Sequence, residues 1–167
     1  MRNEKTDLLR GLRAVRRFED RPIPEAELTE ILEVARWTGT ASNQQAWKVV
    51  VVRDRATLDA LAECGVQHLA QAAVGLVIVS PGTIPELEAF DEGRISERMM
   101  LAALAQGIAS GVGWFKNGGR ARARELIGAP AASAVRTAVS LGYSAPGAEL
   151  GRHRRPLAEF VSERSYS

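Results

Sequence analysis

The sequence predicts an α+β fold in which a central sheet is sandwiched by helices, within one domain at residues 1–167. Three runs of apolar and β-branched residues have the composition of buried strands. Longer segments between them repeat apolar residues at every third or fourth position, as amphipathic helices do. Because these strands and helices do not alternate strictly, an α+β arrangement is favoured, and 167 residues are enough to enclose one core.

The first part of the chain is expected to hold two helices and a strand. Residues 6–15 place leucines at helical spacing, with Thr6 as the candidate N-cap. A second helix is expected from Pro24 to Trp37, because a proline at the first position and acidic residues in the first turn favour a helix start. The valine-rich run at residues 47–52 then predicts a buried strand.

The middle of the chain predicts two further helices and a second strand. Residues 54–63 have a helical pattern, and residues 66–72 are expected to form a short helix. The apolar run at residues 74–79 predicts another buried strand. Residues 81–90 contain two prolines and are expected to form a brief loop.

The strongest helical pattern covers residues 95–109. It is apolar nearly all round, which is typical of a central, buried helix. A lone small domain has difficulty covering such a helix, so we expect a dimer that buries additional surface.

The last third of the chain predicts two strands and a small helix before an irregular tail. Residues 111–115 form a glycine-flanked strand pattern, residues 120–127 a basic helix, and residues 136–143 a third clear strand. The tail at 147–167 is basic and has one apolar stretch at 157–161.

Composition and charge exclude several classes of function. Twenty-two basic against 20 acidic residues leave a net charge of +2, which argues against nucleic acid as the main partner. A single cysteine, Cys64, and two distant histidines, His68 and His153, supply neither a disulfide framework nor a zinc site. We read Cys64 as a packing residue and His68 as a partly exposed polar one. No apolar run approaches the ~20 residues of a membrane helix, and the first residues do not resemble a signal peptide, so we expect a cytoplasmic protein without membrane partners.

Three arginines near the start could bind an anion. Arg13, Arg16 and Arg17 are spaced three and four apart and would project to one side of a helix. Such like charges repel unless an anion or neighbouring acids neutralise them, and guanidinium groups suit phosphate. The alternative is a solvated basic face neutralised by Glu19 and Asp20.

A dense polar segment leads into the first strand. Residues 40–45 are nearly all polar, and Asn43 and Gln45 could point the same way if the backbone there is extended. Two fixed amides suit a planar heterocycle that is rich in donors and acceptors. The alternative is an ordinary polar turn that fixes Trp47 on the core.

Together these segments resemble the opening of the nitroreductase family, and the resemblance continues along the chain in the same order. The matching segments are Arg13–Phe18, Pro22–Ile23, Ala41–Trp47, Lys48–Val52, Asp91–Gly93, Met99–Ala103, Gly107–Gly111 with Trp114, Ile127–Pro130, Leu141–Tyr143 and Arg154–Leu157. Two positions depart from the family pattern, because Ala14 stands in place of a serine and Ala46 in place of a proline. The loss of a hydroxyl at Ala14 is expected to weaken the binding of a phosphate.

The resemblance implies a mostly antiparallel sheet, an intertwined homodimer, and FMN bound at the dimer interface. In that arrangement Arg13, Ala14 and Arg16 lie at the phosphate and ribityl end, and Asn43 and Gln45 meet the ribityl hydroxyls and the flavin ring. The remaining cofactor-binding residues that it implies are Trp114, Phe115 and Lys116 at the other end and Arg152, Arg154 and Arg155 over the phosphate. A solvated charge run is the alternative for the last three.

The implied activity is an oxidoreductase that takes hydride from NADH or NADPH and reduces an electron-poor small molecule such as a nitroaromatic or a quinone. The flavin carries this chemistry, so no catalytic side chain is required. One alternative is a flavin-binding carrier or sensor without turnover, because the short stretch at 81–91 could leave the site poorly formed. A nucleic-acid-binding module, resting on basic residues 120–124 and the tail, is a further alternative.

Overall fold

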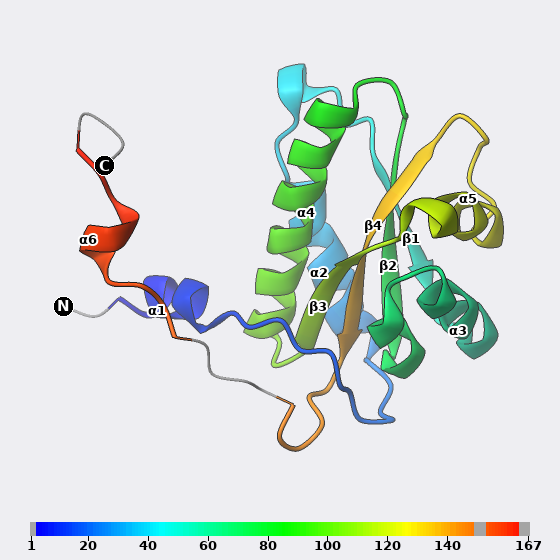
Figure 1. Cartoon of the computed structure of the whole chain (residues 1–167). Coiled ribbons are helices and arrows are strands. Elements are labelled where there is room, and N and C mark those ends of the chain that lie inside the picture. The colour runs from blue at the N-terminus through cyan, green and yellow to red at the C-terminus, as the bar shows by residue number, and fades with distance from the viewer. Residues whose placement is uncertain (1–2, 149–152, 164–167) are drawn as a thin grey trace.

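The computed structural model describes residues 3–148 and 153–163 and contains a four-stranded antiparallel sheet (Figure 1). The strand order is β1-β2-β4-β3. Every neighbouring pair is antiparallel, so the predicted α+β fold with an antiparallel sheet is confirmed. The strands are β1 (Lys48–Val52), β2 (Val74–Ser80), β3 (Ala109–Trp114) and β4 (Ala134–Gly142).

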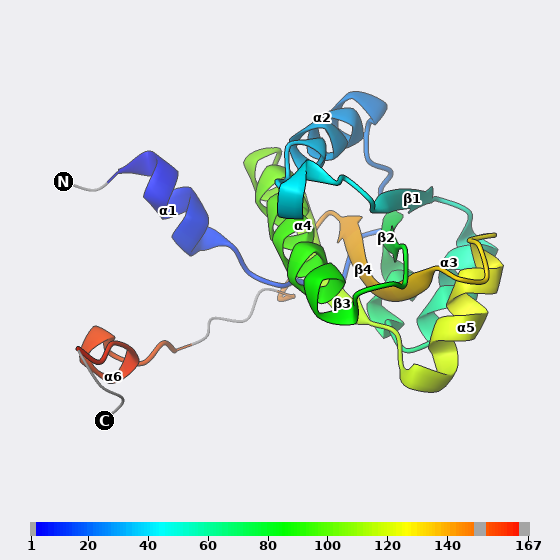
Figure 2. The ribbon, with the colours of Figure 1, turned by 90° about the horizontal axis from the view of Figure 1, so that it is seen from above.

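Helices cover both faces of the sheet, as the view from above shows (Figure 2). On one face, α2 (Glu25–Arg36) and α4 (Pro85–Ala105) pack on Leu76 and Ile78 of β2. On the other face, α3 (Arg55–Glu63), the 3₁₀ helix η2 (Gln67–Gln71) and α5 (Asn117–Leu126) enclose Val77 and Val79 of the same strand. All residues of β2 are buried, which explains why this strand reads as a continuous apolar run.

The predicted loop at 81–90 is wrong over most of its length, because α4 begins at Pro85. Proline at the first helical position is compatible with a helix start. The carboxylate of Glu88 also accepts hydrogen bonds from the backbone N–H groups of Thr83 (2.7 Å) and Ile84 (3.3 Å), which would otherwise lack partners. The helix ends at Ala105, earlier than predicted, and Gly107 follows with a positive φ of 70°.

The first predicted helix is also shorter than expected, since α1 (Glu4–Gly11) stops before the arginine segment. From residue 12 the chain is not helical, and Ala14 pairs with Ser110 of β3 in a parallel bridge. Pairing with the sheet therefore replaces the helical conformation that the spacing of the arginines suggested.

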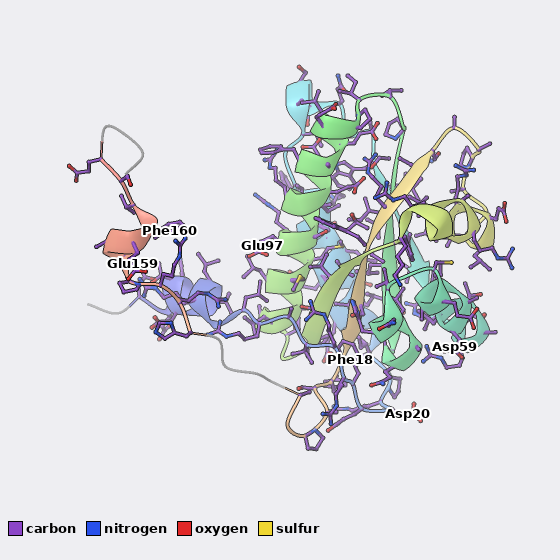
Figure 3. All side chains as sticks on the ribbon, viewed as in Figure 1. Phe18, Asp20, Asp59, Glu97, Glu159 and Phe160 are labelled. Carbon is purple, nitrogen blue, oxygen red and sulfur yellow. The ribbon has the colours of Figure 1, made fainter. Side chains whose placement is uncertain are left out.

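Both described ends of the chain extend away from the sheet (Figures 1 and 2). Helix α1 contacts α4, and the short α6 (Leu157–Phe160) lies farther out (Figure 3). Their apolar side chains are open to solvent, with Leu9 55% and both Leu157 and Phe160 73% exposed. Apolar surface of this extent is typical of segments that pack against another chain.

Candidate functional site

Three cavities are lined in part by residues of the edge strand β3. The largest, about 580 Å³, lies on the α4 side and is lined by Val112, Gly113 and Trp114 together with α4 residues. A second cavity of about 440 Å³ is lined by Val112, Gly113, Arg16 and His68. A third, of about 250 Å³, is lined by Ser110 and Arg13. The edge of β3 is thus the axis of one candidate site.

This edge offers backbone hydrogen-bonding groups because β3 is the last strand of the sheet. The segment that contains Ala14 and Val15 covers only the beginning of this edge, where the Val15 N–H donates to the Ser110 carbonyl at 2.7 Å. From Val112 onward the edge borders two of the cavities. Backbone donors and acceptors in a row can bind the edge of a planar heterocycle.

The structure brings Arg13, Ala14 and Arg16 to one end of this edge, in an extended rather than a helical segment. The Arg13 guanidinium donates to the carbonyls of Arg10 (2.7 Å) and Leu12 (2.8 Å). Ala14 is exposed beside Ser110, and Arg16 lines the cavity that contains His68. Positive charge is therefore concentrated at the start of the β3 edge.

At the other end, only one of three predicted residues presents its side chain to the large cavity. Trp114 is 73% exposed and lines it. Phe115 points into the core and is 1% exposed, so its ring cannot line a cofactor site, and this prediction is corrected. Lys116 is exposed at the start of α5, and its backbone N–H donates to the Cys64 carbonyl.

Sequence reasoning missed His68, which reaches the same edge from η2. Burial lowers the pKa of His68 to about 4, and the charge of Arg16 contributes in the same direction. His68 is therefore neutral at pH 7. The hydrogen bond that fixes it, to Ser140 of β4, joins residues far apart in the sequence, so no local pattern could have indicated its role.

Asn43 and Gln45 are placed elsewhere, in a tight turn that contains the 3₁₀ helix η1 (Ala41–Asn43). The extended backbone that the two amides would need in order to point the same way is not formed, because Ser42, Asn43 and Gln45 all have positive φ, of 50°, 54° and 48°. The Gln45 N–H donates to the Thr40 hydroxyl at 2.9 Å, which stabilises this turn. Left-handed conformations of residues other than glycine cost free energy and are concentrated at functional sites.

The amide turn and the arginine segment occupy opposite corners of the sheet. The turn shares a small cavity with Ser80 of β2, and Ser80 pairs with Ala134 at the start of β4. The arginine segment pairs with β3 through Ala14 and Ser110. Ser110 in turn pairs with Leu141, near the end of β4. The seven residue steps along β4 from Ala134 to Leu141 span ~23 Å at ~3.3 Å per residue. In addition, β1 and β3 are the two outer strands. One protomer does not bring both predicted halves together.

The basic tail also lies apart from the β3 edge. Arg154 and Arg155 are exposed in the segment before α6, which extends away from the sheet (Figures 1 and 3). Arg152 lies outside the described residues. The predicted role of this tail at a phosphate is therefore not assembled within one protomer.

Comparison with known proteins decides the family. The family model described as "Nitroreductase family" matches residues 9–64. An NADH dehydrogenase of Thermus thermophilus is 32% identical over an alignment of 190 positions, and this alignment covers 89% of this chain and 90% of that protein. A protein of Archaeoglobus fulgidus with the provisional name NADH dehydrogenase/NAD(P)H nitroreductase is 33% identical over 142 residues, or 78% of this chain and 80% of its own. The chain belongs to the nitroreductase family.

A solved structure has the same fold as this nitroreductase-family chain. The NADPH:FMN oxidoreductase of Vibrio harveyi in complex with NAD⁺ matches it with a TM-score of 0.84 at 24% identity. The match covers 99% of this chain and 79% of the Vibrio harveyi chain. At this identity the likeness establishes the fold alone.

Neither a metal-binding cluster nor a membrane-spanning helix occurs in the part of the chain that the structure describes. Across residues 3–148 and 153–163, no three metal-ligating side chains of His, Cys, Asp or Glu cluster together. The helices in the same part of the chain are too short or too polar for any of them to cross a membrane.

Proposed function

We propose that this chain is an FMN-dependent oxidoreductase that takes hydride from NADH or NADPH and reduces an electron-poor small molecule such as a nitroaromatic or a quinone. The observation that carries the proposal is the edge of β3, with Arg13 and Arg16 at one end, Trp114 at the other, and cavities along its whole length. Bound FMN supplies the chemistry, accepting and donating hydride at its N5 position.

The residues present suit FMN along this edge. The guanidinium groups of Arg13 and Arg16 would hold the phosphate, for which paired arginines are well suited. Backbone groups of β3 around Val112 and Gly113 would bind the edge of the ring system. His68, neutral at pH 7 because burial lowers its pKa to about 4, adds a polar group without a charge. No general base is required of the protein.

The active form in this proposal is a homodimer, in which the two halves of the site come from different protomers. Asn43 and Gln45 of one protomer would serve the β3 edge of the other, because within one protomer they lie at the opposite corner of the sheet. Exposed apolar side chains on the outlying helices supply surface for such an interface. Arg154 and Arg155 on the extended tail could reach a phosphate in the same assembly.

The large cavity beside Trp114 is the proposed place for the nicotinamide and then for the acceptor. Met100 of α4 and Trp114 of β3 give this cavity apolar surface that suits flat rings, beside charged residues such as Arg120. Its volume of about 580 Å³ is within the range of small-molecule sites. The non-catalytic alternative rested on a short loop at 81–91, and that segment instead contributes to α4, which forms one wall of this cavity.

Reconstitution with FMN tests the proposal. The purified chain is mixed with FMN and passed through gel filtration, and the visible spectrum of the eluted protein is recorded before and after anaerobic addition of NADH or NADPH. We expect oxidised-flavin absorbance that elutes with a dimer and bleaches on addition of at least one nucleotide. Bound flavin that neither nucleotide bleaches would favour a carrier or sensor. A protein that retains no flavin would refute the proposal.

A further inference from the structure

The side-chain hydroxyl of Ser110 has no hydrogen-bond partner among the described residues, although the residue is only 2% exposed. Its backbone is held in the sheet, since its carbonyl accepts from Val15 N–H at 2.7 Å and the residue pairs with Leu141 of β4. Buried hydroxyl groups nearly always have a partner, because leaving one unpaired is costly. An unpaired hydroxyl on a residue that lines a cavity leaves a hydrogen bond open for a ligand there.

The hydroxyl-bearing residue lines a cavity that already suits an anion. Ser110 shares the cavity of about 250 Å³ with Arg13, and small or backbone groups of Gly11 and Gly107 leave room there. Ser144, the other hydroxyl residue of this cavity, is already engaged, because its Oγ donates to the Ala145 carbonyl at 3.4 Å. Ser110 is thus the hydroxyl donor at this cavity that still lacks an acceptor in the described structure.

Ser110 also lies directly beside Ala14, the position at which this chain has alanine in place of the serine of the family pattern. Ala14 and Ser110 are paired in a parallel bridge. Paired residues of neighbouring strands carry their side chains on the same face, with Cβ atoms ~5 Å apart. A hydroxyl on Ser110 can therefore reach a group that lies next to the methyl group of Ala14.

We propose that the Ser110 hydroxyl donates a hydrogen bond to a phosphate oxygen of FMN and supplies the contact that Ala14 cannot make. This inference rests on the proposed function, since it takes FMN as the ligand. A hydroxyl that donates to a phosphate dianion forms a charge-assisted hydrogen bond, which is stronger than a bond between neutral groups. Arg13 at the same cavity supplies the positive charge.

The test compares FMN with riboflavin, which lacks the phosphate, on the full chain and on Ser110→Ala. Dissociation constants are measured by quenching of flavin fluorescence. We expect Ser110→Ala to weaken FMN binding about tenfold, the effect of one lost charge-assisted hydrogen bond. Riboflavin binding should change less than about twofold, and adding Ala14→Ser to Ser110→Ala should restore much of the FMN affinity.

The control is Thr38→Val, which removes another buried hydroxyl without a partner, at the end of α2 and away from β3. It should leave the ratio of the FMN and riboflavin affinities unchanged. The melting temperature without flavin reports folding, and Ser110→Ala should melt no lower than the unmodified chain, because the hydroxyl that it loses is unpaired.

The outcomes separate this inference from the proposed function. If the unmodified chain binds FMN and Ser110→Ala binds it equally well, or loses FMN and riboflavin to the same extent, the phosphate contact is refuted and the proposed function stands. If the unmodified chain binds neither flavin, the proposed function itself fails.

Discussion

Nδ1 of His68 lies 2.6 Å from Oγ of Ser140, and that hydroxyl donates in turn to the Gly111 carbonyl of β3 at 3.1 Å. Because the Ser140 hydroxyl donates to Gly111, its oxygen can accept a hydrogen bond from Nδ1 of His68 in the tautomer that carries the proton there. Nε2 faces Gly113, where a Cβ atom would stand only 2.8 Å away. A polar chain of three residues thus ties η2 to β4 and to the edge strand of the candidate site.

This arrangement predicts that the protein loses stability in mild acid. His68 has a pKa of about 4 in the folded state, compared with 6.5 when unperturbed. Between these values the unfolded chain binds a proton that the folded chain does not, so stability is full above pH 6.5 and falls as the pH decreases towards 4. Urea unfolding at pH 7.5 and pH 5 should show a loss of about 2 kcal/mol from this residue.

His68→Gln is the control for that prediction. Glutamine keeps a polar side chain of similar length but does not titrate, so the difference between pH 7.5 and pH 5 should shrink by about 2 kcal/mol. An unchanged pH dependence in this variant would show that other groups cause the loss.

Gly113→Ala is predicted to destabilise the protein. The added Cβ would stand 2.8 Å from both Nε2 of His68 and Cγ1 of Val66, closer than packed atoms approach. Overpacking of this kind costs about 1–3 kcal/mol, and the displaced β3 edge should also bind flavin less well. Gly118→Ala on α5 is the matched control, because nothing lies within 4 Å of its added Cβ. It should stabilise the helix by up to about 1 kcal/mol. Equal melting temperatures for the two variants would contradict the packing argument.

Arg136→Met is predicted to be the most destabilising of these changes. The carboxylate of Glu92, 4% exposed, accepts hydrogen bonds from Arg136 (2.7 Å), Thr137 (2.7 Å) and Ser80 (2.8 Å). Without the guanidinium, a buried negative charge remains uncompensated, which typically costs 3–5 kcal/mol. Arg136→Met combined with Glu92→Gln removes both charges and should recover part of the loss. Thermal unfolding measures both, and a double variant less stable than the single one would refute the account.

The limits of the sequence-based prediction follow from the range of the interactions. The valine-rich strands β1 and β2 were predicted to within one residue, because their signal lies in the strands themselves. The start of α4 was missed because Glu88, in the first turn of the helix, is held by Arg136 of β4, 48 residues away. In the same way, the spacing of the arginines suggested a helix because the local pattern contains nothing about the bridge from Ala14 to β3.

The shared site can be tested by complementation between protomers. One variant carries Arg13→Ala and Arg16→Ala, and the other carries Asn43→Ala and Gln45→Ala. Each homodimer should bind little FMN, because each of its sites lacks one half. In a heterodimer purified with two affinity tags, one site would combine intact arginines from one protomer with intact amides from the other. We therefore expect about one FMN per heterodimer, measured by flavin absorbance against protein concentration. If both halves of a site belonged to the same protomer, both sites of the heterodimer would be defective, and it would bind no more FMN than either homodimer. Because the arginine segment and the amide turn lie at opposite corners of the sheet in one protomer, we expect the heterodimer to bind about one FMN.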